Sequence, residues 1–259
     1  METDTKSVTG GSQTLMRGLD VIEAVAAGEV TLHQLSETLG LTRSTTHRLA
    51  ASLVERGYLG FTPREGYRLG PKLLALGHLA QEQADIIQIA RPHLEAVAQL
   101  TGDTVHLGVM EDDYALYLDK MPGKRRVTIS SRVGDRQPLT STGLGKALML
   151  DHSPEYWSER FMLEHADRHP HVGFDVWSER MVEYVRTGRA FDLEENEDQI
   201  RCVAAPLRDA RDAIVGAISV SSAALYMSDE RMEELSDIVL ATAHAISRDL
   251  GCTSLTKEK

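Results

Sequence analysis

The chain has 259 residues, of which 42% are hydrophobic, and its formal net charge at pH 7 is −11. This length is sufficient for two domains of ordinary size. The first residues are polar, and no stretch approaches the ~18 apolar residues of a membrane span, so we expect a cytoplasmic protein without membrane contact. Cys202 and Cys252 lie far apart, which in a chain of this size favours reduced thiols over a disulfide.

Charge is distributed unevenly along the chain. Residues 1–77 contain eight acidic and eight basic residues, whereas residues 78–259 contain 31 acidic and 20 basic residues. A strongly acidic surface repels polyanions such as nucleic acids. Any contact with nucleic acid is therefore expected from the neutral N-terminal part.

Three helices are predicted in that part. The first covers residues 13–28, where apolar residues recur at helical spacing before a glycine stop. A short second helix begins at a capping box on Thr31 and ends at Gly40, and the third runs from a Thr42 cap to Gly57. Two helices joined by a Gly-containing turn, with hydrogen-bond donors at the start of the second, form the helix-turn-helix arrangement that enters the DNA major groove.

The start of the third helix carries the candidate DNA-reading residues. At ~100° per residue, Ser44 and Arg48 lie opposite the apolar face and point outward. Arg43 and His47 flank them, and Thr45 is borderline. A solvated helix face is the alternative for such a run taken alone, but the helix-turn-helix context favours contact with DNA.

The segment "GYLGFTPREGYRLG" contains two short β-prone runs around a Pro- and Gly-containing turn. It predicts a hairpin with Gly66 in the left-handed conformation. A hairpin that follows such a helix is a wing, and we expect Arg64, Tyr67 and Arg68 to reach phosphate or the minor groove.

A longer helix is predicted over residues 71–90, opened by Pro71 and interrupted before Pro92. Its leucines pack either against a partner helix or against their own domain, and periodicity alone does not decide between these alternatives.

The second domain is predicted to be α+β around a mainly antiparallel sheet. A helix precedes three strands, several helices, two strands and a closing helix capped by Ser228. The strand candidates are "TVHLGVM", "ALYLDK", "RVTISS", "RCVAAPL" and "AIVGAISVSS".

Several enzyme and metal signatures fail in this domain. The stretch "TSTGLGKALML" has the Gly-Lys of a phosphate loop but carries Thr140 and Ala147 where that motif needs Gly and Ser or Thr. It is better interpreted as a turn that enters a helix, where free N–H groups can bind an anion. The histidines of "EHADRHPH" are expected in a solvated loop, and the five acids of residues 192–198 in an exposed loop. We therefore expect no catalytic set, no metal and no cofactor.

Nearly the whole chain resembles the IclR family of bacterial transcription regulators. The string "TLHQLSETLGLTRSTTHRLAASLVERGYL" is similar to the family's reading unit, and "YRLGPKLLALG" to its passage from wing to linker helix. The resemblance implies a winged helix-turn-helix domain, a linker helix and an effector-binding domain related to GAF and PAS folds. It also implies double-stranded operator DNA as a partner and a homodimer paired through the N-terminal domain and linker helix, with a homotetramer left open. The implied DNA-binding residues are Thr42, Arg43, Ser44, Thr45, His47, Arg48, Arg64, Tyr67 and Arg68.

The resemblance also implies an effector pocket. The family's pattern places it at Gly143, Leu144, Asp192, Cys202, Ser219 and Ser221. Helix N–H groups and serine hydroxyls can donate to a carboxylate, and Asp192 can accept from an effector hydroxyl. These features favour a small carboxylate such as a sugar acid or keto acid. The stretches "VHLGVMEDDYALYLDK", "SSRVGDRQPLTSTGLGKALML" and "IRCVAAPL" resemble the family's sugar-acid-sensing branch. One position departs from the pattern, because Gln199 stands where the family has Gly.

The sequence therefore predicts an effector-controlled transcription regulator, most simply a repressor. The alternative is an enzyme or sensor that binds a small molecule and uses its winged helix for dimerisation. The predicted boundaries are a flexible N-terminus at 1–12, the winged helix-turn-helix at 13–70, the linker helix at 71–91, the effector-binding domain at 92–252 and a flexible tail at 253–259.

Overall fold

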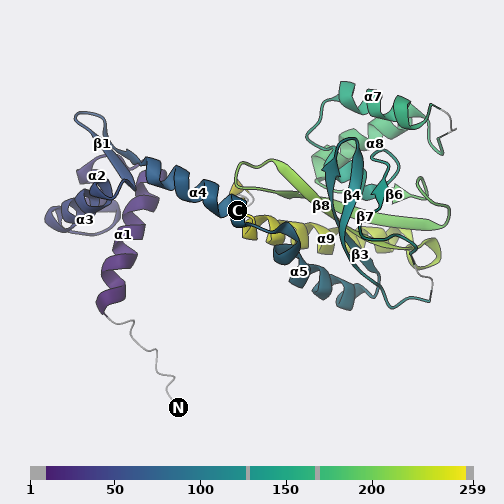
Figure 1. Cartoon of the computed structure of the whole chain (residues 1–259), viewed down its shortest axis with the longest axis horizontal. Helices are drawn as coiled ribbons and strands as arrows, with labels where there is room; N and C mark the ends of the chain where they lie inside the picture. Colours follow the sequence, from purple (N-terminus) through teal and green to yellow (C-terminus); the bar gives the residue numbers. More distant parts are fainter. Residues whose placement is uncertain (1–9, 127–128, 167–169, 255–259) are drawn as a thin grey trace, which may run out of the picture. The chain divides into compact units, whose positions relative to one another are not determined.

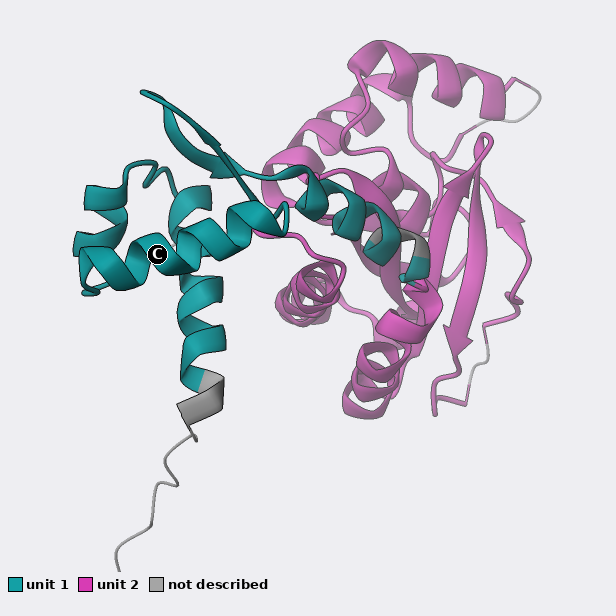
Figure 2. Ribbon diagram, turned by 60° about the vertical axis from the view of Figure 1, so that its left-hand side comes forward, with its two compact units in different colours: residues 1–84 teal, residues 85–259 magenta. Residues whose placement is uncertain are grey.

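The computed structural model describes residues 10–126, 129–166 and 170–254. The chain forms two compact units, residues 1–84 and residues 85–259, which are coloured separately in Figure 2. Residues 1–9 of the predicted flexible N-terminus (1–12) and residues 255–259 of the predicted tail (253–259) lie outside the described residues, whereas residues 10–12 belong to the first helix. Within the described part, no helix is both long and apolar enough to cross a membrane.

The first unit is the expected winged helix-turn-helix. It contains α1 (Gly10–Ala26), α2 (Leu32–Thr38) and α3 (Arg43–Glu55), followed by the hairpin β1 (Leu59–Thr62) and β2 (Gly66–Leu69). These elements enclose a core made of Val21, Ala24, Val25, Leu35, Leu49, Ala50, Leu59 and Tyr67.

The capping prediction for the second helix is confirmed. The Thr31 hydroxyl accepts the backbone N–H of Gln34 at 3.2 Å, and the Gln34 side chain accepts the backbone N–H of Thr31 at 3.0 Å. The first helix begins at Gly10, three residues earlier than expected. Its glycine stop has the expected geometry, with Gly28 at φ +106°.

The wing is fixed to the rest of the unit at one tight contact. The backbone N–H of Tyr67 donates to the carbonyl of Val30 at 2.7 Å. A Cβ on Gly66 would lie 2.2 Å from that carbonyl oxygen, and Gly66 has φ +94°. Both conditions require glycine. Arg64 in the turn is also left-handed, at φ +76°, which was not expected.

The expectation for Tyr67 needs correction. Its side chain is 7% exposed and packs in the core, with its ring centroid 5.0 Å from that of Phe61. Side chains alternate along a strand, so the same β2 that directs Tyr67 inward directs Arg68 outward. Tyr67 therefore belongs to the core of the first unit and packs the wing against it.

The predicted single helix over 71–90 is two helices. The helix α4 (Pro71–Gln83) ends before Ala84, and α5 (Ile86–Thr101) begins after Asp85, whose carboxylate accepts the backbone N–H of Ile87 at 2.9 Å. The unit boundary falls at this break. Pro92 does not end α5; it lies inside it, on a helix whose buried face packs on the sheet.

The second unit is built on an antiparallel sheet, as expected. Within the described residues, six strands have the order β5-β4-β3-β8-β7-β6. One face packs against α5 and α9, and the other against α6, α7 and α8 (Figure 1). The strands are β3 (Thr104–Glu111), β4 (Tyr114–Met121), β5 (Arg136–Gln137), β6 (Ala190–Leu193), β7 (Ile200–Arg208) and β8 (Ile214–Ala223). The helices are α6 (Gly143–Leu148), α7 (Pro154–Glu164), α8 (Phe174–Thr187), the 3-10 turn η1 (Ala224–Tyr226) and α9 (Asp229–Asp249), the last capped by Ser228 as predicted.

Two strand assignments were wrong. The segment "RVTISS" is not a strand in its described residues, and β5 instead forms later, at Arg136–Gln137. The short strand β6 was not predicted. Ser254, in the predicted tail, forms a contact with the second unit, because its hydroxyl donates to the Asp212 carboxylate at 2.8 Å.

Candidate DNA-reading face and effector pocket

The reading helix α3 presents polar side chains on the side away from its core. Arg43, Ser44, His47 and Arg48 are exposed, whereas Thr46 is fully buried. This matches the helical geometry expected from the sequence.

Thr42 and Thr45 hold the start of this helix together. The Thr42 hydroxyl accepts the Thr45 backbone N–H at 3.3 Å and donates to the Thr45 hydroxyl at 2.9 Å. Thr45 is half-buried. Both hydroxyls are thus engaged in capping, and the remaining exposed donors are those of Arg43, Ser44, His47 and Arg48.

The wing adds two exposed cations. Arg64 stands at the tip of the hairpin. Arg68 lies across Gly60 of the paired strand, where a Cβ would come within 3.0 Å of its guanidinium carbon. A larger residue at position 60 would displace this arginine.

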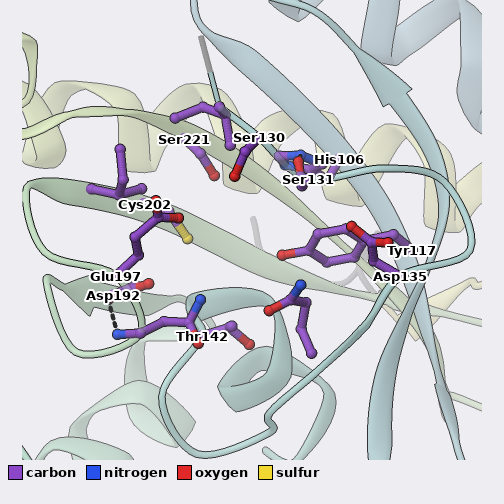
Figure 3. Close-up of a pocket in the computed structure, with 14 residues that line it drawn as sticks. His106, Tyr117, Ser130, Ser131, Asp135, Thr142, Asp192, Glu197, Cys202 and Ser221 are labelled. Atoms are coloured by element: carbon purple, nitrogen blue, oxygen red, sulfur yellow. Dashed lines mark hydrogen bonds between the residues drawn. The ribbon is translucent and has the colours of Figure 1, made fainter. Parts of the chain in front are cut away.

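The second unit contains a polar pocket of about 100 Å³ on the α6 side of the sheet (Figure 3). That size suits a small metabolite better than a drug-sized ligand, for which pockets span ~300–1,000 Å³. One wall is a straight row of paired residues on neighbouring strands: Asp192 of β6 pairs with Cys202 of β7, which pairs with Ser221 of β8. All three line the pocket.

The other three predicted effector residues are not among those that line the pocket. Gly143 packs on Cys202, because a Cβ at that glycine would lie 2.5 Å from the Cys202 sulfur. The Leu144 side chain is 1% exposed and belongs to the core under α7 and α8. Ser219 is also 1% exposed and does not line the pocket. The structure therefore brings Asp192, Cys202 and Ser221 together at the cavity surface.

The opposite wall was missed by sequence reasoning. It consists of His106 on β3, Tyr117 on β4 and a loop that includes Ser130, Ser131 and Asp135. The rings of His106 and Tyr117 stack with centroids 4.7 Å apart. A signal was present, since His106 is the polar residue on one side of an alternating strand, but its neighbours are set by long-range strand pairing.

The pocket has an acidic character. Asp135, Asp192 and Glu197 line it, and within the described residues no Lys or Arg does. Burial raises the pKa of Asp192 to about 6, opposed by the nearby Lys146 ammonium. Burial and the Asp192 charge raise the pKa of the Cys202 thiol to about 12. The cysteine is therefore a neutral thiol.

The acidic segment 192–198 is exposed only in part, at residues 196–198. Asp192 and Glu195 are buried, and Glu195 forms ion pairs with the buried Lys146 and with Arg180, at 2.6 Å from the latter. The Lys146 ammonium also donates to the Phe191 carbonyl at 2.9 Å. The lysine of the phosphate-loop-like stretch thus fixes α6 beneath the pocket.

Metal binding receives no support. Among the described residues, no group of three or more His, Cys, Asp or Glu side chains is arranged to hold an ion. His165 packs its ring on Phe161 at 4.5 Å and lies 3.1 Å from the Thr140 hydroxyl. His171 is exposed, and His169 lies outside the described residues.

Gln199, which stands where the family has Gly, has φ +61°. This left-handed conformation is the one that glycine adopts without strain. Its carbonyl accepts the Ala224 N–H at 2.7 Å, which joins the loop before β7 to the end of β8.

A winged helix-turn-helix unit, followed by a separate domain with a polar pocket, defines a ligand-responsive transcription regulator. Comparison with known proteins agrees. Family models match at residues 14–63, the IclR helix-turn-helix domain, and at residues 78–248, the bacterial transcriptional regulator IclR C-terminal domain. The chain belongs to the IclR family and binds operator DNA through its helix-turn-helix. It is a regulator and not an enzyme, which sets aside the enzyme alternative.

Three similar proteins illustrate this membership. The DNA-binding transcriptional repressor YiaJ of Escherichia coli (strain K12) is 33% identical over 257 residues, with 96% of this chain and 91% of YiaJ covered. The HTH-type transcriptional regulator KdgR of the same organism is 29% identical, with 86% of each chain covered. The crystal structure of Pseudomonas aeruginosa HmgR has a TM-score of 0.81 at 22% identity and covers 93% of this chain and 99% of HmgR, which supports the fold.

Proposed function

We propose that the protein is a repressor that leaves its operator, or binds it less tightly, when a small hydroxylated carboxylate such as a sugar acid fills the pocket. The repressor activity is supported by the similarity to YiaJ. Arg43, Ser44, His47 and Arg48 would read bases or phosphates, and Arg64 and Arg68 would contact backbone phosphates.

The proposed class of effector is supported by the polar groups that line the pocket. Asp192 and Glu197 offer carboxylate oxygens, which accept hydrogen bonds from the hydroxyls of a polyhydroxy compound. Ser130, Ser131 and Ser221 supply hydroxyl groups for the oxygens of a carboxylate, whereas the Thr142 hydroxyl already donates to the Pro138 carbonyl at 2.7 Å. A compound that bears both hydroxyls and a carboxylate can form more hydrogen bonds with the pocket than an acid without hydroxyls.

We further propose that the DNA-binding form is a homodimer joined through the first unit, with a tetramer as a higher assembly. Leucines of α4 support this arrangement, because Leu74 is 78% exposed, Leu79 48% and Leu76 39%. Apolar side chains concentrated on one exposed helix are typical of an interface. A dimer also provides two reading helices for two half-sites.

The effector class can be tested by thermal unfolding of the intact protein with sugar acids, keto acids and aromatic acids. A bound compound at ~100 times its Kd adds ~2.7 kcal/mol of apparent stability. Compounds that stabilise the protein are then added to a gel-shift titration with a DNA site selected from random sequence. We expect a sugar acid to stabilise the protein and weaken DNA binding. Stabilisation by aromatic acids alone would contradict the proposed class.

A further inference from the structure

The second unit contains another cavity, which lies between β7 and α9 beside the end of α8. Its volume is about 140 Å³, against about 100 Å³ for the polar pocket. The two cavities share no lining residue. Cys202 of β7 lines the polar pocket, whereas Ala205 of the same strand belongs to the core on the α5 and α9 face and lines the second cavity, which we call the α9 cavity.

The sequence leaves this space open in two ways. The strand β6 pairs with β7 only as far as Ala190 with Ala204, so within the described residues β7 has no strand neighbour on that edge from Ala205 onward. The side chains that α9 directs at this part of β7 include the small Ala243 and Ser247. Native cores contain few voids larger than a water molecule. A cavity of this size therefore calls for an occupant.

The polar side chains around the α9 cavity already have partners. The Arg208 guanidinium donates to both carboxylate oxygens of Asp151, at 2.7 and 2.8 Å. The Ser247 hydroxyl donates to the Ala243 carbonyl at 2.7 Å and accepts the Arg208 backbone N–H at 2.9 Å. His244 is likewise engaged within the chain. The other lining residues are Gly, Ala, Pro and Leu, so an occupant finds carbon surface rather than free hydrogen-bonding groups.

The size and chemistry of the cavity define the class of compound that fits it. Water in a cavity needs about two to four polar partners, whereas an apolar cavity of about 150 Å³ stays dry and binds benzene or xenon. The α9 cavity has nearly that volume. It therefore suits a compact apolar group and disfavours a charged acid, which would lose its hydration without gaining a free partner.

An occupant of the α9 cavity contacts the helical layer from which the chain passes to the first unit. The helix α9 packs with α5 on one face of the sheet, and the His93 ring nitrogen Nε2 lies 2.8 Å from the Asp249 carboxylate. The helix α5 begins directly after Asp85, where the boundary between the two units falls. A compound wedged between β7 and α9 thus bears on the layer that adjoins this boundary.

We propose that the α9 cavity is a second small-molecule site, which takes a compact apolar compound the size of a benzene ring or a short branched aliphatic chain. Its occupancy changes the affinity of the protein for DNA through the layer of α5 and α9. The proposal does not rest on the sugar-acid class of effector, because the polar pocket takes no part in it.

Binding is tested with benzene on the full-length protein by calorimetry, and with xenon by backbone ¹H–¹⁵N NMR. Both probes should bind wild type, and xenon should move the signals of Gly188, Ala205 and Ala243. Ala243→Leu fills the cavity and should weaken benzene by about tenfold or more, and Ala243→Val by less. Ala241→Leu, on the exposed side of the same helix, is the matched control and should bind benzene as wild type does.

The functional consequence is measured by fluorescence anisotropy with a DNA site selected from random sequence, with and without saturating benzene. We expect benzene to change the DNA affinity of wild type and of Ala241→Leu by about threefold or more, and to leave that of Ala243→Leu unchanged. Because no sugar acid is added, this result is independent of the proposed effector class.

Three outcomes would overturn the proposal. If neither benzene nor xenon binds wild type, or if Ala243→Leu binds benzene as well as wild type does, the cavity is not the site. If benzene binds but leaves the DNA affinity unchanged, the cavity is a packing void only. If Ala243→Leu alters the mass measured by sedimentation whereas Ala241→Leu does not, the cavity receives a side chain from a second copy of the chain.

Discussion

Asp192 is 4% exposed, and its carboxylate accepts the backbone N–H of Glu195 at 2.8 Å. Its pKa is about 6 in the folded protein against an ordinary value of 3.8. The folded state therefore binds the proton more tightly than the unfolded state. The resulting stabilisation is complete below about pH 4 and is lost as pH rises through about 6, a change of about 3 kcal/mol.

The corresponding prediction concerns Asp192→Asn, which keeps an oxygen for the Glu195 N–H but cannot ionise. Relative to wild type, its free energy of unfolding should improve by about 2 kcal/mol between about pH 4.5 and pH 8, because about 1 kcal/mol of the total is already lost at pH 4.5. Urea denaturation at both pH values measures this difference. An equal difference at both would mean that Asp192 does not titrate with a raised pKa.

Gln199 provides a second prediction at the scale of one residue. A non-glycine residue in the left-handed region costs ~1–2 kcal/mol, while glycine loses ~0.5–1 kcal/mol more in conformational entropy on folding. Gln199→Gly should therefore stabilise the protein by up to about 1 kcal/mol, as seen in its urea midpoint. Gln199→Ala, which keeps a Cβ, should give no such gain. If both variants behave alike, the backbone at this position carries no strain.

Arg48 is exposed on the reading face, beside Ser44. Arg48→Ala should lower affinity for the selected DNA site by ~1–3 kcal/mol if the guanidinium makes a bidentate base contact. Arg56, the exposed C-cap residue of the same helix, provides the control, and Arg56→Ala should leave site preference intact. Gel-shift titrations measure both, and equal affinities for the two variants would remove Arg48 from the reading surface.

At the scale of the element, helix ends were the most predictable features. Thr31, Thr42 and Ser228 all cap helices as their sequence patterns indicated. The break before Asp85 was missed, although Asp is a good N-cap residue, because a continuous apolar spacing hid it. Pro92 was taken as a helix end, but burial of Ala90 and Leu94 against the sheet outweighs the hydrogen bond that proline removes.

The candidate site likewise has one part that the sequence predicts and one part that it does not. Alternation along β8 placed Ser219 and Ser221 on one face, and strand pairing brings Ser221 beside Cys202. On the opposite wall, strand alternation places His106 on one face of β3, but the loop at 129–135 has no local periodicity that could reveal its position beside that histidine. The position of this wall depends on the pairing of β3 with β8, which are distant in sequence and leave no pattern within a short window.

The helix α4 carries a prediction about assembly. Leu74→Lys and Leu79→Lys place charges among the exposed leucines of this helix and should shift the protein toward monomers, with weaker operator binding because two half-sites are no longer read together. Leu100→Lys on α5 is the control, since Leu100 is 70% exposed in the second unit. Sedimentation analysis gives the masses. An unchanged mass for both α4 variants would place the dimer interface elsewhere.

At the scale of the whole molecule, regulation requires that the effector bind the DNA-competent and DNA-incompetent arrangements with different affinity. Ser221 lines the pocket, and its hydroxyl hydrogen-bonds the Cys202 thiol, whereas Ser219 lies buried beside the pocket wall. The two serines therefore allow the effect of a ligand contact to be separated from that of packing.

We predict that Ser221→Ala weakens effector binding by ~1–3 kcal/mol, so that about fivefold to 150-fold more effector is needed for the same loss of DNA affinity. Ser219→Ala should change this requirement much less. Operator binding without effector should match wild type in both variants. Calorimetry with gel-shift titration measures the two steps, and a normal effector affinity in Ser221→Ala would show that the hydroxyl makes no contact with the bound compound.

The packing of Gly143 on Cys202 has a consequence for chemical reactivity. A thiol with a pKa of about 12 holds only about one part in 10⁵ as thiolate at pH 7, and thiolate is the form that oxidants and alkylating reagents attack. The absence of space at Gly143 also denies such reagents an approach from α6. A reagent must therefore reach the sulfur from the pocket, whose surface Cys202 lines, and there it meets a thiol that is almost entirely protonated.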